Sequence, residues 1–391
     1  MGEEAGLGRS ISVVKLVAEV KLCPDAEQAD ALDRTLRECN AAADWLSERA
    51  HETGCKRRYD LHHAAYHGAR DRFALSAQAV CLAIGRVAAA YKRERGTLHR
   101  FRADGAISFD SRLLRWRDGA VSIWTVAGRQ TIPFACGDRQ RTLLAAQAGE
   151  TDLIRRGGKW YLLASCEVAG PEPYEPDGFL GVDLGIVNIA TDSDGRAHAG
   201  AHLNGLRHRH RRLRGRLQAK GTRSAKRLLK ARKRKEARMA RDVNHGIAKS
   251  IVATAERTRR GIALEDLQGI RARARARRPQ RATLHSWAFA QLGSYVDYKA
   301  ALAGVPVAYV DPRNTSRTCP ACGHVAKASR SSRAKFRCVE CSFAGEADHI
   351  AARNIAGRAA VNRPGGSEGC GVGTSHRQSS RSKLPASAGG S

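Results

Sequence analysis

The pattern of apolar and polar positions gives the N-terminal part of the chain a strand, then helices, then more strands. Residues 11–22 are rich in β-branched side chains and predict a strand. Asp25 with Gln28 three residues later is typical of a capped helix start, and apolar residues then recur at helical spacing to about residue 100. From 101 to 170, short apolar runs separated by glycine-containing turns predict hairpins and therefore a small β-barrel.

The C-terminal half alternates short apolar runs with helical segments, after a proline-rich stretch at 171–178 that we interpret as a linker. Residues 179–190 predict a strand, a tight bend and a second strand, and turn residues follow them. Further elements are expected as strands at 261–264 and 305–310 and as helices at 283–303 and 347–359.

The charge balance of the chain is strongly basic. Its 391 residues contain 68 Lys and Arg against 38 Asp and Glu, a formal net charge of +30. Such an excess repels itself, so it argues against a metabolic enzyme and for a polyanionic partner, DNA or RNA. An anionic membrane surface is the alternative, but no apolar run approaches the roughly 18 residues of a membrane span. Seven of the eleven cysteines are scattered without pattern, as expected for reduced thiols in a soluble intracellular protein.

A basic segment lies at 207–241, with 17 Lys or Arg in 35 residues and a single acid, Glu236. It has no aromatic residue for base stacking, so nucleic-acid phosphates are its natural ligand. A solvated charged helix and a localisation-type basic run are the alternatives. The candidate phosphate-binding residues are Arg207, Arg209, Arg211, Arg212, Arg214, Arg216, Lys226, Arg227, Lys230, Lys233 and Arg234. Base stacking could instead come from Trp116, Trp124 and Trp160 in the predicted barrel, although aromatic residues in such strands more often belong to the core.

Four cysteines form two Cys-x2-Cys knuckles late in the chain. Cys319 and Cys322 make the first knuckle, and Cys338 and Cys341 make the second after fifteen intervening residues. This spacing predicts a zinc ribbon in which four thiolates surround one Zn²⁺. Because all four positions are occupied by protein, the zinc would have a structural role. Two redox pairs or two disulfides are the alternative interpretation.

Three carboxylates occupy positions where a metal is a plausible partner. Asp183 lies in an apolar strand, Glu265 lies at the end of another, and Asp348 begins a helix. Burying an unpaired charge is costly, so a strand-borne acid favours a cation. Three converging carboxylates can hold two Mg²⁺ about 4 Å apart for phosphodiester chemistry. The alternatives are a turn residue, an ion pair and a helix cap, respectively. Weaker candidates are Asp192, Asp194, Asp266 and Asp311.

These motifs, in this order, resemble those of the TnpB family of transposon-encoded proteins, which is related to type V CRISPR effectors. The resemblance is specific over 179–357 and only a match of layout over 1–170. It rests on Gly181-Val-Asp183-Leu-Gly-Ile, Ala263-Leu-Glu265-Asp-Leu-Gln-Gly-Ile, Asn314-Thr-Ser-Arg-Thr-Cys319-Pro-Ala-Cys322-Gly-His and Asp348-His-Ile-Ala-Ala-Arg-Asn-Ile355.

The resemblance implies an α/β plus all-β fold: an RuvC-like (RNase H-like) nuclease domain with an inserted zinc ribbon, preceded by a wedge β-barrel that carries a helical insert. The implied boundaries are 1–23 and 101–170 for the barrel, 24–100 for the helical recognition insert, 171–178 for the linker, 179–312 and 342–362 for the nuclease domain, 313–341 for the ribbon and 363–391 for a disordered tail.

The resemblance also implies RNA-guided cleavage of double-stranded DNA beside a short adjacent motif, with a guide RNA derived from the transposon end. Asp183, Glu265 and Asp348 become the catalytic acids and Mg²⁺ ligands, and the protein is expected in a bacterial-type cytoplasm, on the nucleoid when bound to DNA. Around the third acid the chain departs from the family pattern at Glu346 and Ile350. A DDE-type transposase and a non-cleaving RNA-guided repressor are the rival functions, and the oligomeric state stays open.

Overall fold

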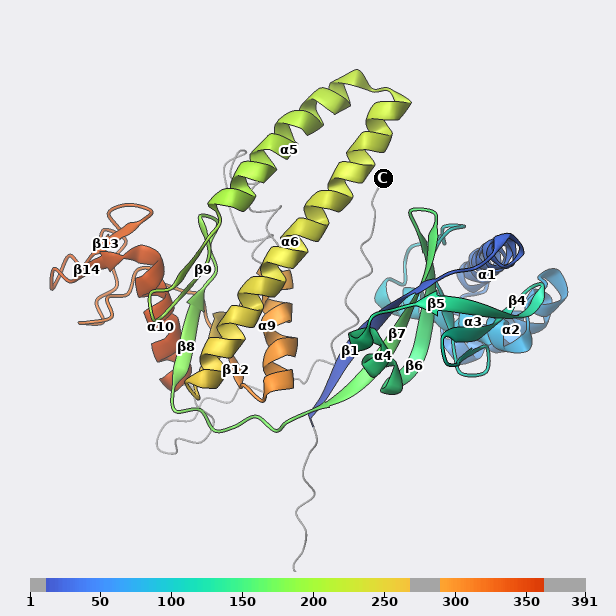
Figure 1. The fold of residues 1–391 in the computed structure, drawn as a ribbon, viewed down its shortest axis with the longest axis horizontal. Coiled ribbons are helices and arrows are strands. Elements are labelled where there is room, and N and C mark those ends of the chain that lie inside the picture. The colour runs from blue at the N-terminus through green and yellow to red at the C-terminus, as the bar shows by residue number, and fades with distance from the viewer. Residues whose placement is uncertain (1–11, 268–288, 362–391) are drawn as a thin grey trace, which may run out of the picture.

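The computed structural model describes residues 12–267 and 289–361 and has two lobes joined by the extended segment 171–178 (Figure 1). Residues 1–11 of the predicted barrel, the start of the helix predicted at 283–303 and the tail predicted at 363–391 lie outside the described residues. Asp177 donates its backbone N–H to the carbonyl of Arg259 at 3.0 Å, which fixes the end of the linker against the C-terminal lobe.

A seven-stranded antiparallel sheet, curled into a nearly closed barrel, forms the centre of the N-terminal lobe. Its order is β2-β6-β7-β1-β5-β4-β3, and β1 pairs with both β7 and β5. Gly157 and Gly158 both have positive φ, as the tight turn between β6 and β7 requires. The elements are β1 (Ser12–Leu22), β2 (Ile107–Phe109), β3 (Leu114–Trp116), β4 (Ala120–Thr125), β5 (Gly128–Ala135), α4 (Asp138–Ala145), β6 (Gln147–Arg156) and β7 (Lys159–Gly170).

Three helices are inserted between β1 and β2, as predicted: α1 (Ala26–Thr53), α2 (Arg58–Arg72) and α3 (Ala77–Arg93). The predicted capping box is present, since Asp25 Oδ1 accepts from the Gln28 N–H at 2.8 Å and Gln28 Oε1 accepts from the Asp25 N–H at 3.2 Å. The helices share one apolar core with the barrel. Trp160 is 4% exposed in that core and is therefore unavailable for stacking on bases.

The C-terminal lobe is built on a five-stranded mixed sheet of order β10-β9-β8-β11-β12. Strands β8, β9 and β10 are antiparallel neighbours, whereas β11 runs parallel to both β8 and β12. The strands are β8 (Phe179–Asp183), β9 (Asn188–Asp192), β10 (Ala197–Ala199), β11 (Gly261–Glu265) and β12 (Val307–Val310). Helices α6 (Arg223–Arg257) and α9 (Phe289–Ala303) cover one face, and α10 (Ala347–Val361) covers the other.

The basic segment predicted at 207–241 is part of a long antiparallel pair of helices, α5 (Ala201–Lys220) and α6, which projects from the sheet in Figure 1. Gly221, with φ 63°, makes the turn, and Thr222 caps α6 by accepting from the Ala225 N–H at 3.2 Å. The last turns of α6 carry the apolar residues that pack on the sheet, so the base of this helical hairpin is anchored and its tip is free to reach outward.

The cysteine segment forms a small ribbon with strands β13 (Lys335–Arg337) and β14 (Ala344–Glu346). Its core contains Cys319, Phe336 and Cys338 together with Ala347 and Ile350 from the first turn of α10. By strand pairing the ribbon therefore continues beyond the predicted end at 341, as far as Glu346. Ile350, one of the departures from the family pattern, is 2% exposed and joins the ribbon to α10.

Candidate active site

Asp183 and Glu265 end two neighbouring parallel strands at the same level. In the register of β8 and β11, Leu264 lies beside Val182, so the next residues, Glu265 and Asp183, are also side by side. Neighbours at one level of a parallel pair project to the same face of the sheet. The apolar strands thus deliver two carboxylates to one point at their carboxyl ends.

Asp348 reaches the same point because α10 lies directly on β8. A Cβ on Gly181 would stand 2.0 Å from the carbonyl oxygen of Ala352, so only glycine permits this approach. Asp348 precedes Ala352 by one helical turn, about 6 Å along the axis. Asp183 follows Gly181 by two residues, about 6.6 Å along the strand and on the same face. Because these distances along the helix and along the strand are nearly equal, Asp348 of α10 lies over Asp183 of β8.

Neutral side chains hold two of the acids in place. Thr315 donates its hydroxyl to Glu265 Oε1 at 2.5 Å, and Asn188 donates Nδ2–H to Asp348 Oδ2 at 3.0 Å. On the ribbon side, Arg330 lies 3.9 Å from Asp348 Oδ1. The sequence reasoning missed these three residues. Thr315 stands within a motif that the sequence analysis quotes, but Asn188 and Arg330 carry no local signal, because only the fold brings them to the acids.

The electrostatics of the site favour a bound cation. Burial raises the pKa of Asp183 to about 7, and the nearby charges of Glu265 and Asp348 contribute to the rise, against the opposing effect of Arg330. Burial also raises the pKa of Glu265, although the Thr315 hydrogen bond opposes this. Burial thus disfavours the charged forms of Asp183 and Glu265, and a bound cation would stabilise them. An oxygen-only donor set of this kind suits Mg²⁺.

The weaker acid candidates have local structural partners. Asp192 Oδ1 accepts from the backbone N–H groups of Asp194 and Arg196, at 3.1 and 2.8 Å. Asp194 pairs with both terminal nitrogens of Arg260, and Asp311 accepts from the Arg313 N–H at 2.9 Å. The Asp266 backbone N–H bonds the Val310 carbonyl. Local hydrogen bonds and one ion pair thus account for Asp192, Asp194 and Asp311 without a metal.

The ligand atoms of the four cysteines all lie within 4.8 Å of one another. Within 12–267 and 289–361, no other group of three or more potential metal ligands is this compact. The Sγ atoms of Cys319 and Cys341 are 3.6 Å apart, as are those of Cys322 and Cys338. A disulfide would bring sulfurs to about 2.05 Å, whereas four Zn–S bonds of about 2.3 Å place them about 3.8 Å apart. The four-cysteine cluster can therefore hold zinc, while the three carboxylates are more widely spread.

The predicted phosphate-binding residues lie along the helical hairpin. Ten of the eleven are exposed, and Arg207 is half-buried. The single acid, Glu236 of α6, contacts α5 through Arg214 at 3.0 Å and His210 at 3.5 Å. Arg214 is thus engaged within the hairpin, which leaves the other exposed cations as better candidates for an external ligand.

Comparison with known proteins relates this site to a family. Residues 289–355 match the family model "Cas12f1-like, TNB domain". The chain is 31% identical to the TnpB-like protein MJ0751 of Methanocaldococcus jannaschii over 122 residues, 31% of this chain and 43% of that protein. It is 28% identical to the putative RNA-guided DNA endonuclease InsQ of Escherichia coli K12 over 221 residues, 51% of this chain and 53% of that protein. Over these regions the chain is similar to TnpB-like proteins.

The structural comparison extends the similarity over more of the chain. A cryo-EM structure of a Cas12f1–sgRNA–target DNA complex aligns with a TM-score of 0.58 at 14% identity, covering 83% of this chain and 82% of that one. At this identity the match shows a shared fold. A Cas12f1 of Syntrophomonas palmitatica is 26% identical to this chain over 216 residues, 51% of this chain and 42% of that protein. The chain thus spans only about half of the length of these curated relatives.

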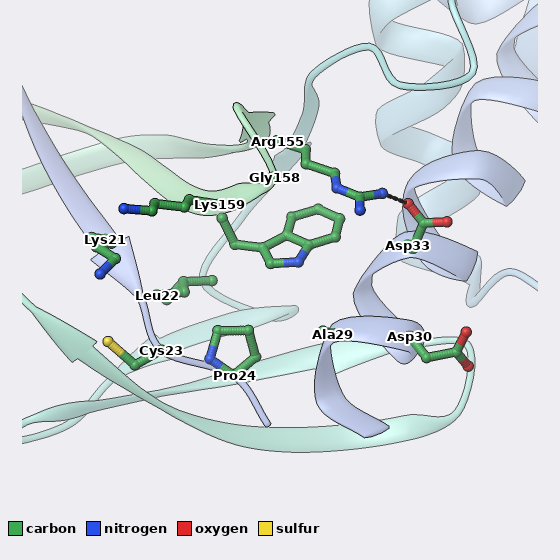
Figure 2. Close-up of a pocket in the computed structure, with 11 residues that line it drawn as sticks. Lys21, Leu22, Cys23, Pro24, Ala29, Asp30, Asp33, Arg155, Gly158 and Lys159 are labelled. Atoms are coloured by element: carbon green, nitrogen blue, oxygen red, sulfur yellow. Dashed lines mark hydrogen bonds and ion pairs between the residues drawn. The ribbon is translucent and has the colours of Figure 1, made fainter. Parts of the chain in front are cut away.

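A second candidate site is a cleft of ≈ 530 Å³ where β1, α1 and the β6–β7 hairpin meet (Figure 2). Lys21 and Lys159 supply positive charge at its edge, and Leu22, Pro24 and Trp160 give it an apolar wall. Arg155 spans the cleft to Asp33, and its guanidinium carbon lies 5.4 Å from the centre of the Trp160 ring.

No helix within 12–267 and 289–361 is both long and apolar enough to cross a membrane.

Serine replacement of Cys319 or Cys341 is expected to remove the zinc and destabilise the ribbon, because metal binding supplies folding free energy to so small a unit. Since Ile350 and Ala347 complete the ribbon core, loss of the zinc should also destabilise the first turn of α10. Metal analysis should give one zinc per chain in the wild type and none in the variants. The variants should also be less soluble or bind the target less tightly. Cys55→Ser, at a half-buried cysteine outside both the cluster and the cleft, is the control. Folded, fully active wild-type protein without zinc would contradict the prediction.

Proposed function

We propose that the protein is an RNA-guided, metal-dependent endonuclease of a transposable element, with an RuvC-like core that cuts double-stranded DNA beside a short adjacent motif. The observation that carries the proposal is the placement of Asp183 and Glu265 at one level of two parallel strands, with Asp348 above them on α10. The names of the similar proteins, InsQ and the Cas12f nucleases, support the same activity.

In this proposal the three acids form one shared site for two Mg²⁺ ions, and the rest of the chain keeps their oxygens in place. When bound, the cations would activate a water for attack on the phosphodiester and stabilise the leaving 3′-oxygen. Thr315 and Asn188 fix the orientation of Glu265 and Asp348 through the hydrogen bonds described above. Arg330, at the edge of the site, is placed to contact a phosphate or to balance the charge of Asp348.

Sequence specificity in this proposal comes from a guide RNA. The acids and their neighbours offer oxygen ligands, the Asn188 amide and the guanidinium groups of Arg330 and Arg358, and so small a set cannot read bases along a long target. Base pairing with an RNA made from the transposon end would read the target, and the protein would read only the adjacent motif. The cleft of Figure 2, between barrel and helical insert, offers Lys21 and Lys159 as contacts for phosphates beside that motif.

The products of a reaction with guide RNA, Mg²⁺ and target duplex distinguish this function from its rivals. An endonuclease releases two cut DNA ends, a DDE-type transposase joins a 3′ end to a new strand, and a repressor leaves the duplex bound and intact. We expect cut, unjoined ends. Joined products would favour the transposase, and intact DNA with tight binding would favour the repressor.

The helical hairpin is proposed to hold the backbone of the guide RNA or of the guide–target duplex. Replacing Arg209, Arg211 and Arg212 by glutamine is expected to weaken binding whatever the sequence, because each phosphate contact releases a condensed counterion. The slope of log K against log salt should flatten by about 0.7–0.9 for each lost contact. The measurement is RNA binding between low and moderate salt.

The matched control for the hairpin removes three exposed arginines that already pair with acids inside the chain, Arg34, Arg49 and Arg102. This variant has the same change in net charge and should keep the wild-type slope. If the hairpin variant also keeps it, the hairpin surface is solvated and binds no phosphate.

A further inference from the structure

Thr191 is a buried hydroxyl that has no hydrogen-bond partner among the described residues. The residue is 2% exposed on β9, and its Oγ1 forms no hydrogen bond with any other group of 12–267 and 289–361. Burying a hydroxyl without a partner costs folding free energy, and valine of the same shape would avoid that cost. A threonine at this position therefore points to a partner that is outside the polypeptide.

The hydroxyl is next to the candidate cation site. In the antiparallel register of β8 and β9, Thr191 lies directly opposite Asp183, and opposite residues share one face of the sheet. That face is the one on which Gly181 meets α10, and so the one that carries Asp348. Cross-strand partners place their Cβ atoms about 4.5–5.5 Å apart. Thr191 is therefore a direct side-chain neighbour of Asp183.

We propose that Thr191 is a positioning residue of the cation site, whose hydroxyl hydrogen-bonds a water carried by the cation on Asp183. The inference rests on the proposed function and deepens it. Mg²⁺ gives up its waters reluctantly and keeps several of them in protein sites. A fixed acceptor and donor on β9 would orient one of these waters, as Thr315 and Asn188 orient the carboxylates of Glu265 and Asp348.

The simplest alternative is that Thr191 is an ordinary core residue whose hydroxyl is merely unsatisfied. Thr151 of β6 provides a matched case, because it is 1% exposed in the barrel and its Oγ1 also has no partner among the described residues. Under the alternative, Thr191→Val and Thr151→Val should behave alike, with unchanged or slightly higher stability and no effect on metal binding. Under the proposal, only Thr191→Val weakens metal binding.

The test measures occupation of the site directly, with Fe²⁺ as the probe. Added hydrogen peroxide oxidises bound Fe²⁺ to Fe³⁺ and yields hydroxide and a hydroxyl radical, and added ascorbate reduces the iron again. The radicals cut the nearby polypeptide, so the dose response of the fragment that ends near residue 183 gives an affinity independent of DNA cleavage. The full-length protein with its co-purified RNA is used, and competition by Mg²⁺ shows that both ions share the site. Thr191→Val is expected to lower the Fe²⁺ affinity about 10-fold or more, while Thr191→Ser, which keeps the hydroxyl, and Thr151→Val keep the wild-type affinity.

Asp183→Ala separates failure of this inference from failure of the proposed function. If Asp183→Ala leaves the Fe²⁺-dependent cutting of the polypeptide unchanged, the acids hold no cation and the proposed function itself fails. If Asp183→Ala abolishes this cutting and Thr191→Val leaves the Fe²⁺ affinity unchanged, only the role of Thr191 is overturned. Thr191→Ala serves as the second hydroxyl-free variant should the valine variant not fold, and an unchanged affinity there overturns the proposal equally.

Discussion

Alanine replacement of Asp183, Glu265 or Asp348, one at a time, is expected to lower the rate of DNA cleavage by at least about a thousandfold, because the several kcal/mol that a bound metal contributes to the transition state is lost with its ligand. Single-turnover cleavage with saturating guide RNA measures the chemical step. Target binding should change little, because the acids lie at one point of a surface that is otherwise strongly basic. Asp194→Ala is the control, since Asp194 pairs with Arg260 on the exposed side of the β9–β10 turn.

The pH dependence of the wild type belongs to the same prediction. With its pKa near 7, Asp183 retains a proton below that pH in the folded protein, so a cation must displace the proton to bind. The Mg²⁺ concentration for half-maximal cleavage should therefore fall as the pH rises from about 6 to about 8. In metal-free protein the raised pKa means that ionised Asp183 opposes folding. The stabilisation gained by Asp183→Asn should be largest above about pH 7 and shrink as the pH falls toward about 4.

Full cleavage by any one of the three alanine variants would remove that residue from the site.

Removal of bound RNA is expected to abolish site-specific cutting altogether. The net charge of +30 is large enough to keep an RNA as a permanent partner, and the exposed cations of the α5–α6 hairpin present it with a surface of suitable length. Protein purified from its host should therefore carry one discrete RNA species, identified by sequencing. Nuclease-stripped protein should retain its fold and zinc but show no preferred cleavage site. Site-specific cutting by stripped protein would favour a transposase that reads DNA by itself.

Much of this site could be predicted from the sequence because its residues carry strong local signals. The cysteine spacing is sufficient to predict the cluster, and the structure confirms that the four sulfurs converge. An acid within an apolar strand, such as Asp183, is conspicuous because the pattern otherwise excludes charge. The capping box at Asp25 and the glycine turn at Gly157 are likewise local features, and the structure confirms both.

What the sequence did not predict depends on contacts between distant segments. Asn188, Arg330 and Thr191 are ordinary polar residues until β9 and the ribbon are packed beside the acids, and no periodicity marks them. The role of Glu236 appears only when α5 and α6 are seen to pair, because its partner His210 is 26 positions away. The ribbon extends past Cys341 for a similar reason: β14 is short and exposed, and only its pairing with β13 reveals it.

The most direct test of the central claim is a guide exchange. The protein is reconstituted with its own RNA or with an RNA whose pairing segment has been changed, and cleavage of a DNA library in Mg²⁺ is mapped by sequencing. We predict that the cut sites move to the DNA that matches the new segment, that the short flanking motif stays the same, and that Asp183→Ala cuts neither target. Cut sites that remain at the original sequence after the exchange would contradict RNA guidance.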